Sequence, residues 1–397
     1  YRELRLMLEA KGYEFHSDTD TEVLLYLYAE EGPAMLDRLN GMFAIAIWDR
    51  RRNRLVLARD PLGVKQLFVA ADSRRLIFGS ELKCLLSVPD FNPSVCRKAI
   101  HEYFTFGLIF APNSIYTGVD KLLPGEYLVA DGNSEVARYR YWQLPGNGDD
   151  NERWNDEEYA VDALEEQLAQ CVRRQLVSDV PLGVLLSGGI DSSLIAAIAS
   201  SATGSPVKTF SIGFPDGRYD ESPYAVAVSQ HLGTDHRNLM LESEDLLDVL
   251  PKLAWHYDEP FADSSAVPTY QVSRLTREHV TVALSGDGGD ELFGGYTQFQ
   301  NERLIEHVKP IVSALRLPGL PRLLSYLLAL SSTCDFSLRR DRFYRLLVDA
   351  ALPGPAHRFF MKAMLARSET RRRIYSRDFL EEVGADDNTN ALIERLE

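Results

Sequence analysis

The stretch Ser187-Gly188-Gly189-Ile190-Asp191-Ser192-Ser193 decides the fold of the second half of this chain. It follows the apolar run 184–186 and precedes the apolar run 194–198, so the order is buried strand, glycine turn, helix. The two glycines let the backbone turn tightly and bring its N–H groups close to an anion. The N-terminus of the following helix adds partial positive charge. The stretch therefore predicts a phosphate-binding loop at the end of a parallel strand.

This loop differs from two common phosphate-binding patterns, since it has neither the lysine of the Walker motif nor a Gly-x-Gly-x-x-Gly arrangement. A serine-capped helix after a glycine turn would explain each part of the loop alone, but not the complete string. The string resembles the pyrophosphate loop of the ATP-pyrophosphatase family. The resemblance implies an enzyme that cleaves ATP between its α and β phosphates and adenylates a carbonyl oxygen, and it leaves the substrate open.

Length, charge and cysteine usage restrict the function further. The 397 residues are enough for two domains with substantial cores. A formal net charge of -15 argues against a nucleic-acid partner, and no apolar run approaches the roughly 20 residues of a membrane span. The four cysteines are scattered without paired spacing, which indicates structural thiols in a reducing cytosol. We therefore predict a cytoplasmic enzyme that acts on small molecules, with no nucleic-acid or membrane partner.

A polar, glycine-rich segment, residues 146–152, separates two sequence patterns and is interpreted as the interdomain linker. Before it, closely spaced strands and helices predict an α+β layered domain. After it, strands and helices alternate, which predicts a parallel, doubly wound α/β sheet, and from about residue 298 the pattern is helical. The arginine clusters 339–340 and 371–373 are interpreted as solvated helix faces. The predicted strands are 42–48, 54–58, 67–70, 75–78, the strand at Val184, 207–212, 237–241 and 280–284, and the predicted helices are 21–30, 81–86, 156–176, 224–231, 244–257 and 266–278.

A second glycine-rich loop, Ser285-Gly286-Asp287-Gly288-Gly289-Asp290-Glu291-Leu292-Phe293-Gly294-Gly295-Tyr296, follows the predicted strand 280–284. A flexible acidic loop is the simpler interpretation, but ligands of parallel sheets bind at the carboxyl ends of the strands, where this loop begins. Mg²⁺ is held by one or two carboxylates plus phosphate oxygens, so Asp191 and Asp290 are predicted to bind it. Asp287 is then free to act on the reacting carboxyl group or on the incoming amine.

Both loops together resemble the synthetase domain of the glutamine-hydrolysing asparagine synthetase family, and residues 258–266, Asp-Glu-Pro-Phe-Ala-Asp-Ser-Ser-Ala, are also typical of that family. The resemblance implies that ATP activates aspartate as a β-aspartyl adenylate and that ammonia then displaces AMP. The implied nucleotide contacts are Leu185, Ile212, Ser285 and Gly286, the pyrophosphate contacts are Ser187, Gly188, Gly189 and Ser192, the Mg²⁺ ligands are Asp191 and Asp290, and the residue at the adenylate is Asp287, where many members have Glu.

The first domain resembles the glutaminase domain of the same family in residues 17–22, 39–44 and 59–63. The resemblance implies an α+β N-terminal-nucleophile (αββα) domain over residues 1–145. A parallel-sheet synthetase domain of the ATP-pyrophosphatase type would follow over residues 153–397, with a helical C-terminal extension. The resemblance also implies that Asp20 binds the α-amino group of glutamine. An N-cap of the helix that starts at Thr21 is an equally natural role for Asp20, and one residue could serve both purposes.

Both ends of the chain depart from the family pattern. The resemblance implies a nucleophilic cysteine at the mature N-terminus, whereas this chain begins with Tyr1, and none of its cysteines is placed to substitute. A family segment that carries a pyrophosphate-binding lysine is not found before Glu397. We therefore expect an internal fragment of a longer enzyme, with little or no activity of its own.

The leading hypothesis is an asparagine synthetase that uses ATP, Mg²⁺, glutamine and aspartate, and a homodimer is compatible with it. One alternative is a related amide- or β-lactam-forming synthetase on the same scaffold. The other is a degenerate regulatory module that has lost catalysis. The intact carboxylates Asp191, Asp287 and Asp290 argue against the degenerate module.

Overall fold

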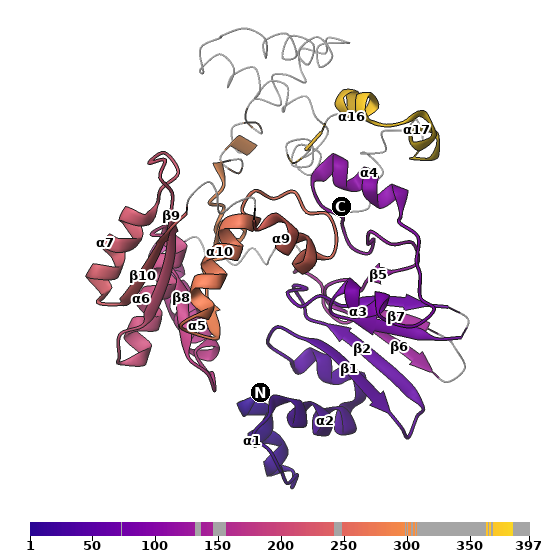
Figure 1. Cartoon of the computed structure of the whole chain (residues 1–397). Coiled ribbons are helices and arrows are strands. Elements are labelled where there is room, and N and C mark those ends of the chain that lie inside the picture. Colours follow the sequence, from indigo (N-terminus) through magenta and orange to yellow (C-terminus); the bar gives the residue numbers. More distant parts are fainter. Residues whose placement is uncertain are drawn as a thin grey trace. The chain divides into compact units, whose positions relative to one another are not determined.

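The computed structural model describes residues 1–72, 74–131, 136–145, 156–241, 248–297 and 368–383, with a few further residues between 299 and 366. The chain forms two compact units (Figure 1). The first unit comprises Tyr1–Asp149, Tyr257–Ala262 and Arg371–Val383. The second comprises Asp150–His256, Asp263–Thr370 and Gly384–Glu397.

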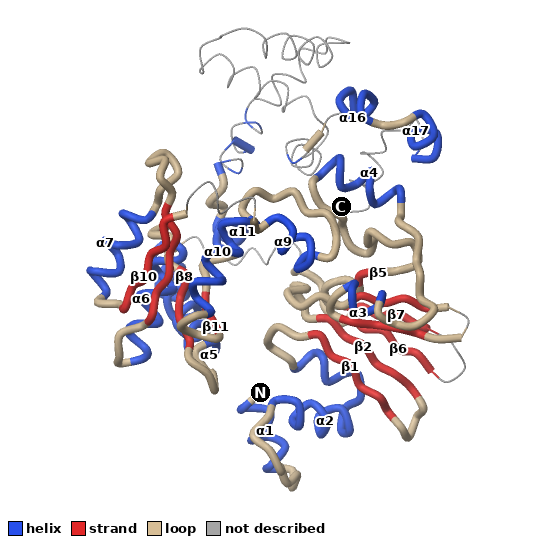
Figure 2. Tube along the Cα trace, viewed as in Figure 1, coloured by secondary structure: helices blue, strands red, loops and turns tan. Residues whose placement is uncertain are grey.

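The first unit is built on two antiparallel sheets with a shared core. The sheets have the strand orders β1-β2-β6-β7 and β4-β3-β5. The four strands of the first sheet are labelled in Figure 2, together with β5 of the second. Leu57 of β2 and Val69 of β3 are buried in the same cluster, so the two sheets lie face to face. The strands are β1 (Ala44–Asp49), β2 (Arg54–Arg59), β3 (Phe68–Ala71), β4 (Leu76–Gly79), β5 (Asp120–Lys121), β6 (Glu126–Asp131) and β7 (Val136–Arg140).

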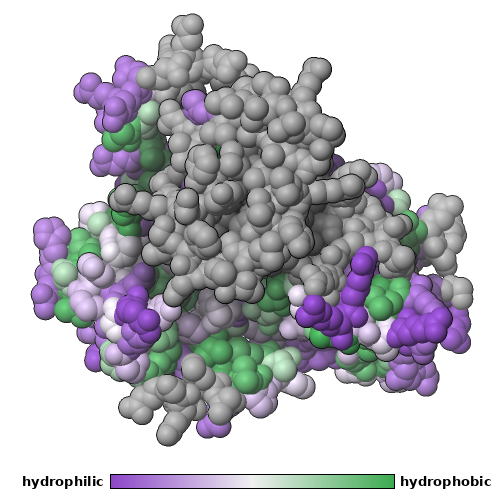
Figure 3. Space-filling view, turned by 90° about the horizontal axis from the view of Figure 1, so that it is seen from above, coloured by the Kyte–Doolittle hydropathy of each residue, from purple (hydrophilic) through white to green (hydrophobic). Residues whose placement is uncertain are grey.

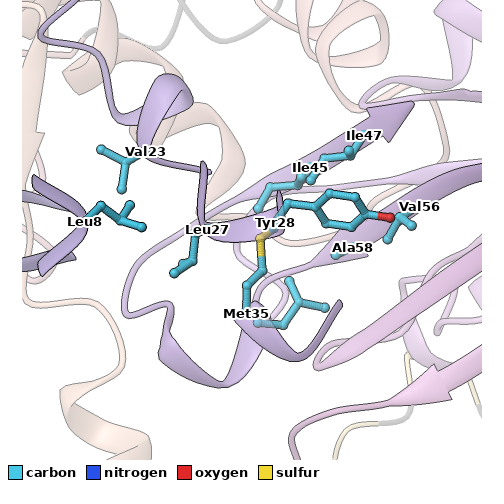
Figure 4. Packing of buried hydrophobic residues seen from close by; sticks show 10 residues of the cluster. Leu8, Val23, Leu27, Tyr28, Met35, Ile45, Ile47, Val56 and Ala58 are labelled. Atoms are coloured by element: carbon cyan, nitrogen blue, oxygen red, sulfur yellow. The ribbon is translucent and has the colours of Figure 1, made fainter. Parts of the chain in front are cut away.

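Helices cover the outer face of each sheet. Neighbouring side chains of a strand point to opposite faces, so one packs against the other sheet and the next against a helix. Val56, next to Leu57 in β2, points away from the other sheet and packs with Leu27 of α2, and Tyr28 lies among the same strand side chains (Figure 4). Phe68, next to Val69 in β3, packs instead with Leu82 of α3. The layers are therefore helix, sheet, sheet, helix. The helices are α1 (Arg2–Ala10), α2 (Asp20–Glu31), the 3-10 helix η1 (Gly32–Arg38), α3 (Leu82–Leu86), α4 (Arg97–Phe106) and α17 (Arg377–Val383).

The second unit has a parallel sheet with the strand order β10-β9-β8-β11, which confirms the predicted alternation of strands and helices. Val184 of β8 is fully buried and packs with Ala196 of α6 and Ala225 of α7. The strands are β8 (Leu182–Leu185), β9 (Lys208–Gly213), β10 (Asp235–Met240) and β11 (Val282–Leu284). The helices are α5 (Glu157–Gln175), α6 (Ile190–Thr203), α7 (Ser222–Leu232), α9 (Leu250–Tyr257), α10 (Ala266–Arg277) and α11 (Gly289–Phe293). A further helix, α16 (Ser368–Ile374), begins in this unit and ends in the first.

The structure corrects one prediction about the arginine clusters. Arg371 is not solvated but only 2% exposed, and burial lowers its pKa. It lies near His101 of α4, whose pKa is lowered by burial and then by the positive charge of Arg371. Arg372 and Arg373 are exposed, as predicted. The predicted linker 146–152, the arginines 339–340 and most of the region after residue 298 lie outside the described residues, and so does the first part of the predicted helix 244–257.

The structure contains several helices and strands that were not predicted from the sequence, among them α4, β6 and β7. In β7 nearly every residue is exposed, so the strand has no apolar alternation by which it could be predicted. Among the described residues, no helix has the length and apolarity needed to cross a membrane. On the face shown in Figure 3, hydrophobic and hydrophilic patches alternate over the described residues.

Candidate active site

The two glycine loops follow β8 and β11, which are hydrogen-bonded neighbours in the parallel sheet. Because parallel strands end at the same edge, both loops border one cavity of about 790 Å³. The cavity also receives residues from the end of β9. The predicted site residues in its lining are Leu185, Ser187, Gly189, Asp191, Ser192, Ile212, Ser285, Gly286, Asp287 and Asp290.

Gly188 is the one predicted residue of this site that is not in the cavity lining. Its φ is +86°, and a Cβ atom built on it would lie 2.5 Å from the backbone nitrogen of Ala225 and 2.6 Å from the carbonyl carbon of Tyr224. Both neighbours belong to α7. Glycine is therefore required at position 188 because the loop packs on backbone behind it.

Two hydroxyl groups of the first loop, those of Ser187 and Ser192, lie within hydrogen-bonding distance of each other. The Ser187 and Ser192 Oγ atoms are 2.9 Å apart, and the Gly189 N–H donates to Ser187 Oγ at 3.2 Å. The helix α6 has Gly189 as its N-cap and no side-chain cap hydrogen bond. The simpler interpretation, a serine-capped helix, is therefore wrong, and the hydroxyls hold the loop in shape where a ligand could replace their mutual bond.

The second loop lies directly against Asp191. A Cβ atom at Gly289 would be 2.5 Å from the Asp191 Cγ and Oδ2 atoms, and one at Gly286 would be 2.8 Å from the Ser192 backbone nitrogen. The absence of side chains at these glycines thus lets the Asp191 carboxylate approach the backbone next to Asp290. Both carboxylates line the same cavity.

The donor set fits Mg²⁺ together with a phosphate-bearing substrate. The described residues contain no group of three or more His, Cys, Asp or Glu side chains that could hold a metal ion by themselves. A pair of carboxylates completed by phosphate oxygens and water is a common way to bind Mg²⁺. Asp191 and Asp290 could supply this pair.

Asp287 is held by its own loop. The Ser285 hydroxyl donates to Asp287 Oδ2 at 2.9 Å, which orients the carboxylate at the cavity. Further along, the Tyr296 hydroxyl donates to Glu291 Oε1 at 2.8 Å, and this bond with the carboxylate raises the pKa of Tyr296 to about 12.

The sequence did not predict the rest of the lining. Ser211 of β9 is buried, and its hydroxyl donates to Asn238 Oδ1 at 2.8 Å and lies 3.1 Å from His236 Nε2. Contacts between neighbouring parallel strands leave no local pattern in the sequence. The position of Ser211 in the cavity lining and its contacts with His236 and Asn238 could therefore not be predicted from the sequence. The other unpredicted lining residues include Phe210, Phe214, Tyr219, Glu221, Val272 and Phe293.

Asp20 lies in the first unit, at the N-terminus of α2, and its predicted role as the N-cap is wrong. Thr19 is the N-cap, and its hydroxyl accepts from the Glu22 N–H at 3.3 Å. Glu22 in turn accepts from the His16 N–H at 2.9 Å and the Ser17 N–H at 2.7 Å. This differs from a capping box, in which the Glu22 carboxylate would accept from the N–H of the N-cap itself, because the Thr19 N–H donates instead to Ser17 Oγ at 3.5 Å. Asp20 stays exposed at the first helical position.

We predict that Glu22 keeps this loop in shape down to unusually low pH. The Ser17 hydroxyl and the His16 N–H lower its pKa from 4.5 to about 2. Because the pKa is lower in the folded state, the stabilisation is present above 4.5 and disappears as the pH falls through about 2. The amide signals of His16 and Ser17 in NMR spectra should therefore titrate with a midpoint near 2.

Glu22→Gln should abolish that titration, whereas Glu14→Gln, at an exposed carboxylate nearby, should leave it unchanged. A midpoint near 4.5 for the two amides in the unsubstituted chain would contradict the prediction that these hydrogen bonds hold the loop at low pH.

Comparison with protein families agrees with this two-part architecture. Residues 1–142 match the model described as a glutamine amidotransferase domain, and residues 163–388 match the model described as asparagine synthase. The molecule is thus of the class that joins an amidotransferase domain to a synthetase domain. The chain belongs to the asparagine synthase family.

Individual relatives support the same membership. The chain is 38% identical over 323 residues to a putative asparagine synthetase (glutamine-hydrolyzing) 2 of Methanocaldococcus jannaschii, a match that covers 80% of this chain and 61% of the relative. It is 35% identical over 316 residues to asparagine synthetase (glutamine-hydrolyzing) 1 of Bacillus subtilis, which covers 80% and 49%. The chain therefore spans about half the length of the curated relatives it matches.

More distant proteins are also similar. Amidase chyE of Penicillium rubens is 28% identical over 330 residues, covering 79% of this chain and 48% of the relative. Among solved structures, a glutamine-dependent NAD⁺ synthetase from Acinetobacter baumannii is 14% identical with a TM-score of 0.28, covering 82% of this chain and 84% of that chain.

Proposed function

We propose that this chain belongs to an enzyme that makes asparagine from aspartate, with ATP as the activating substrate and glutamine as the source of ammonia. One observation carries the proposal: two glycine loops border a single cavity of about 790 Å³, and Asp191, Asp287 and Asp290 all line it. A cavity of this size is in the range of small-molecule sites. The family membership supports aspartate and glutamine as the remaining substrates.

In this proposal the nucleotide lies against the strand ends at Leu185 and Ile212 and against Ser285 and Gly286. Ser187, Gly189 and Ser192 exchange their mutual hydrogen bonds for bonds to the departing pyrophosphate. Gly188 keeps the loop in place from behind.

Asp191 and Asp290 would hold Mg²⁺, which when bound would offset the charge that develops on the phosphates. The β-carboxylate of aspartate displaces pyrophosphate from the α phosphorus of ATP, and ammonia then displaces AMP from the activated carbonyl carbon. Asp287 orients the reacting carboxyl group or accepts the proton that ammonia loses.

We further propose that the first unit is a glutaminase with an N-terminal-nucleophile fold over residues 1–145, and that Asp20 binds the α-amino group of glutamine. Its helix, sheet, sheet, helix layering supports this fold. The synthetase domain is proposed to cover residues 153–397. The net charge of -15 argues against a nucleic-acid partner, the scattered cysteines support the cytoplasm, and a homodimer remains a prediction.

Release of pyrophosphate by the complete protein, measured with aspartate and with other carboxylic acids, tests the proposal. We expect ATP-dependent release with aspartate and Mg²⁺, together with equal amounts of AMP and asparagine when ammonia is present. The second candidate is a related amide-forming synthetase on the same scaffold, since the chain is also 28% identical to two proteins that are not named asparagine synthetases. Release with another acid but not with aspartate would establish that candidate instead.

A further inference from the structure

The six residues Tyr257–Ala262 form a short strap that joins two parts of the molecule. By sequence they lie inside the match to the asparagine synthase model, residues 163–388. In the structure, however, they belong to the first unit, which also contains the residues matched by the amidotransferase model. The chain thus leaves the second unit after His256, contributes the strap to the first unit, and returns at Asp263.

Glu259 of the strap forms an ion pair and a hydrogen bond with residues of the first unit. Its carboxylate forms an ion pair with Lys121, and the two side chains are only 14% and 8% exposed. Its Oε2 atom also accepts from the Ile115 N–H at 3.3 Å, and Lys121 Nζ donates to the Ile109 carbonyl at 2.7 Å. Burial raises the pKa of Glu259, while Lys121 and the Ile115 N–H oppose that shift.

Two further contacts fix the strap on either side of Glu259. Asp258 pairs with Lys83 Nζ at 2.9 Å, and its carboxylate accepts from the Lys83 N–H at 3.4 Å. Its φ of +61° is unusual for a non-glycine residue, so this backbone turn is held by its surroundings. The Ala262 N–H donates to the Gly107 carbonyl at 2.8 Å. Charge, backbone bonds and burial therefore all anchor the strap to the first unit.

The strap leads directly into the wall of the synthetase cavity. Asp263, which follows it, lies close enough to the second glycine loop for its charge to help raise the pKa of Tyr296. The helix α10 then begins at Ala266, and its Val272 lines the cavity. Nine residues, 263–271, thus separate the anchored Ala262 from Val272 in the cavity wall.

We propose that Asp258 and Glu259 are positioning residues that tie the segment entering the synthetase site to the amidotransferase unit, so that release of ammonia from glutamine is coupled to its use. The anchoring stands on the contacts alone. The coupling rests on the proposed function, because it requires both reactions.

Hydrogen–deuterium exchange on the complete protein tests the anchoring without any activity. Glu259→Gln keeps the size of the side chain but leaves the Lys121 ammonium without its counter-charge. We expect the amides of Ile115 and Ala262 to exchange about tenfold faster or more in this variant, with α6 and α7 of the second unit unchanged. Glu278→Gln, at an exposed carboxylate just beyond α10, is the matched control and should change neither region.

Two results of that measurement would overturn the anchoring: unprotected amides at Ile115 and Ala262 in the unsubstituted protein, or an equal rise in exchange throughout both units in Glu259→Gln.

The ratio of two activities tests the coupling. With ammonia as nitrogen source, Glu259→Gln should form asparagine within about twofold of the normal rate. With glutamine, asparagine formation should fall about fivefold or more while glutamate formation continues. A merely structural role would lower both rates equally, and that outcome would overturn the coupling. If the unsubstituted protein makes no amide from either nitrogen source, the proposed function fails, whereas the exchange experiment still decides the anchoring.

Discussion

Asp191→Asn is expected to lower ATP-dependent pyrophosphate release by about 10²–10³-fold, the effect of removing one group that stabilises charge in a transition state. The substitution preserves the shape of the side chain, so the close approach of Gly289 to position 191 remains possible and the fold should be retained. What it removes is one of the two carboxylates predicted to hold Mg²⁺. The concentration of Mg²⁺ that gives half the maximal rate should therefore rise as well. Steady-state pyrophosphate assays over a range of Mg²⁺ concentrations measure both effects.

Glu221→Gln provides the matched control, because Glu221 is an exposed carboxylate in the lining of the same cavity. It should change the rate less than about threefold, since no role in charge stabilisation is assigned to it. Similar losses in both variants would mean that the general negative charge of the cavity matters, and not a specific site at Asp191.

Gly188→Ala is expected to destabilise the second unit by about 2–5 kcal/mol. The left-handed backbone at Gly188 costs about 1–2 kcal/mol for a residue with a Cβ atom, and overpacking typically adds about 1–3 kcal/mol. Overpacking applies here because the new methyl group would meet backbone atoms of Tyr224 and Ala225, which cannot rotate away. Chemical denaturation, monitored by a probe in the second unit, measures the loss.

Gly204→Ala separates the two contributions. Gly204 ends α6 with a φ of +63°, and a Cβ atom there would have no neighbour within 4 Å. Only the backbone cost of about 1–2 kcal/mol should appear. Equal losses in Gly188→Ala and Gly204→Ala would show that the packing of the loop on α7 contributes nothing.

Local patterns in the sequence predicted the elements that carry the site. The strand, glycine turn and helix around residues 184–198 are encoded by neighbouring residues: an apolar run, two glycines and a second apolar run. The same holds for the loop after β11. Because parallel strands end at a common edge, these local signals were sufficient to bring Asp191, Asp287 and Asp290 to one cavity.

Contacts between distant residues could not be predicted in this way. The burial of Arg371 depends on packing near His101, which lies 270 residues earlier in the chain. Thr19 rather than Asp20 caps α2, because the exact first residue of a helix depends on how the preceding loop folds. Ser211 joins the cavity lining through its place in β9.

The sequence by itself determined the parallel sheet, the two glycine loops and the carboxylates that identify the site, since each rests on residues close together in the chain. Only the tertiary structure decided why Gly188 must be glycine and where residues 257–262 belong. The first depends on the backbone of α7 behind the loop, and the second on Lys83 and Lys121, more than 130 residues away from the strap. Such partners are chosen by the packing of the folded chain, and no local pattern records them.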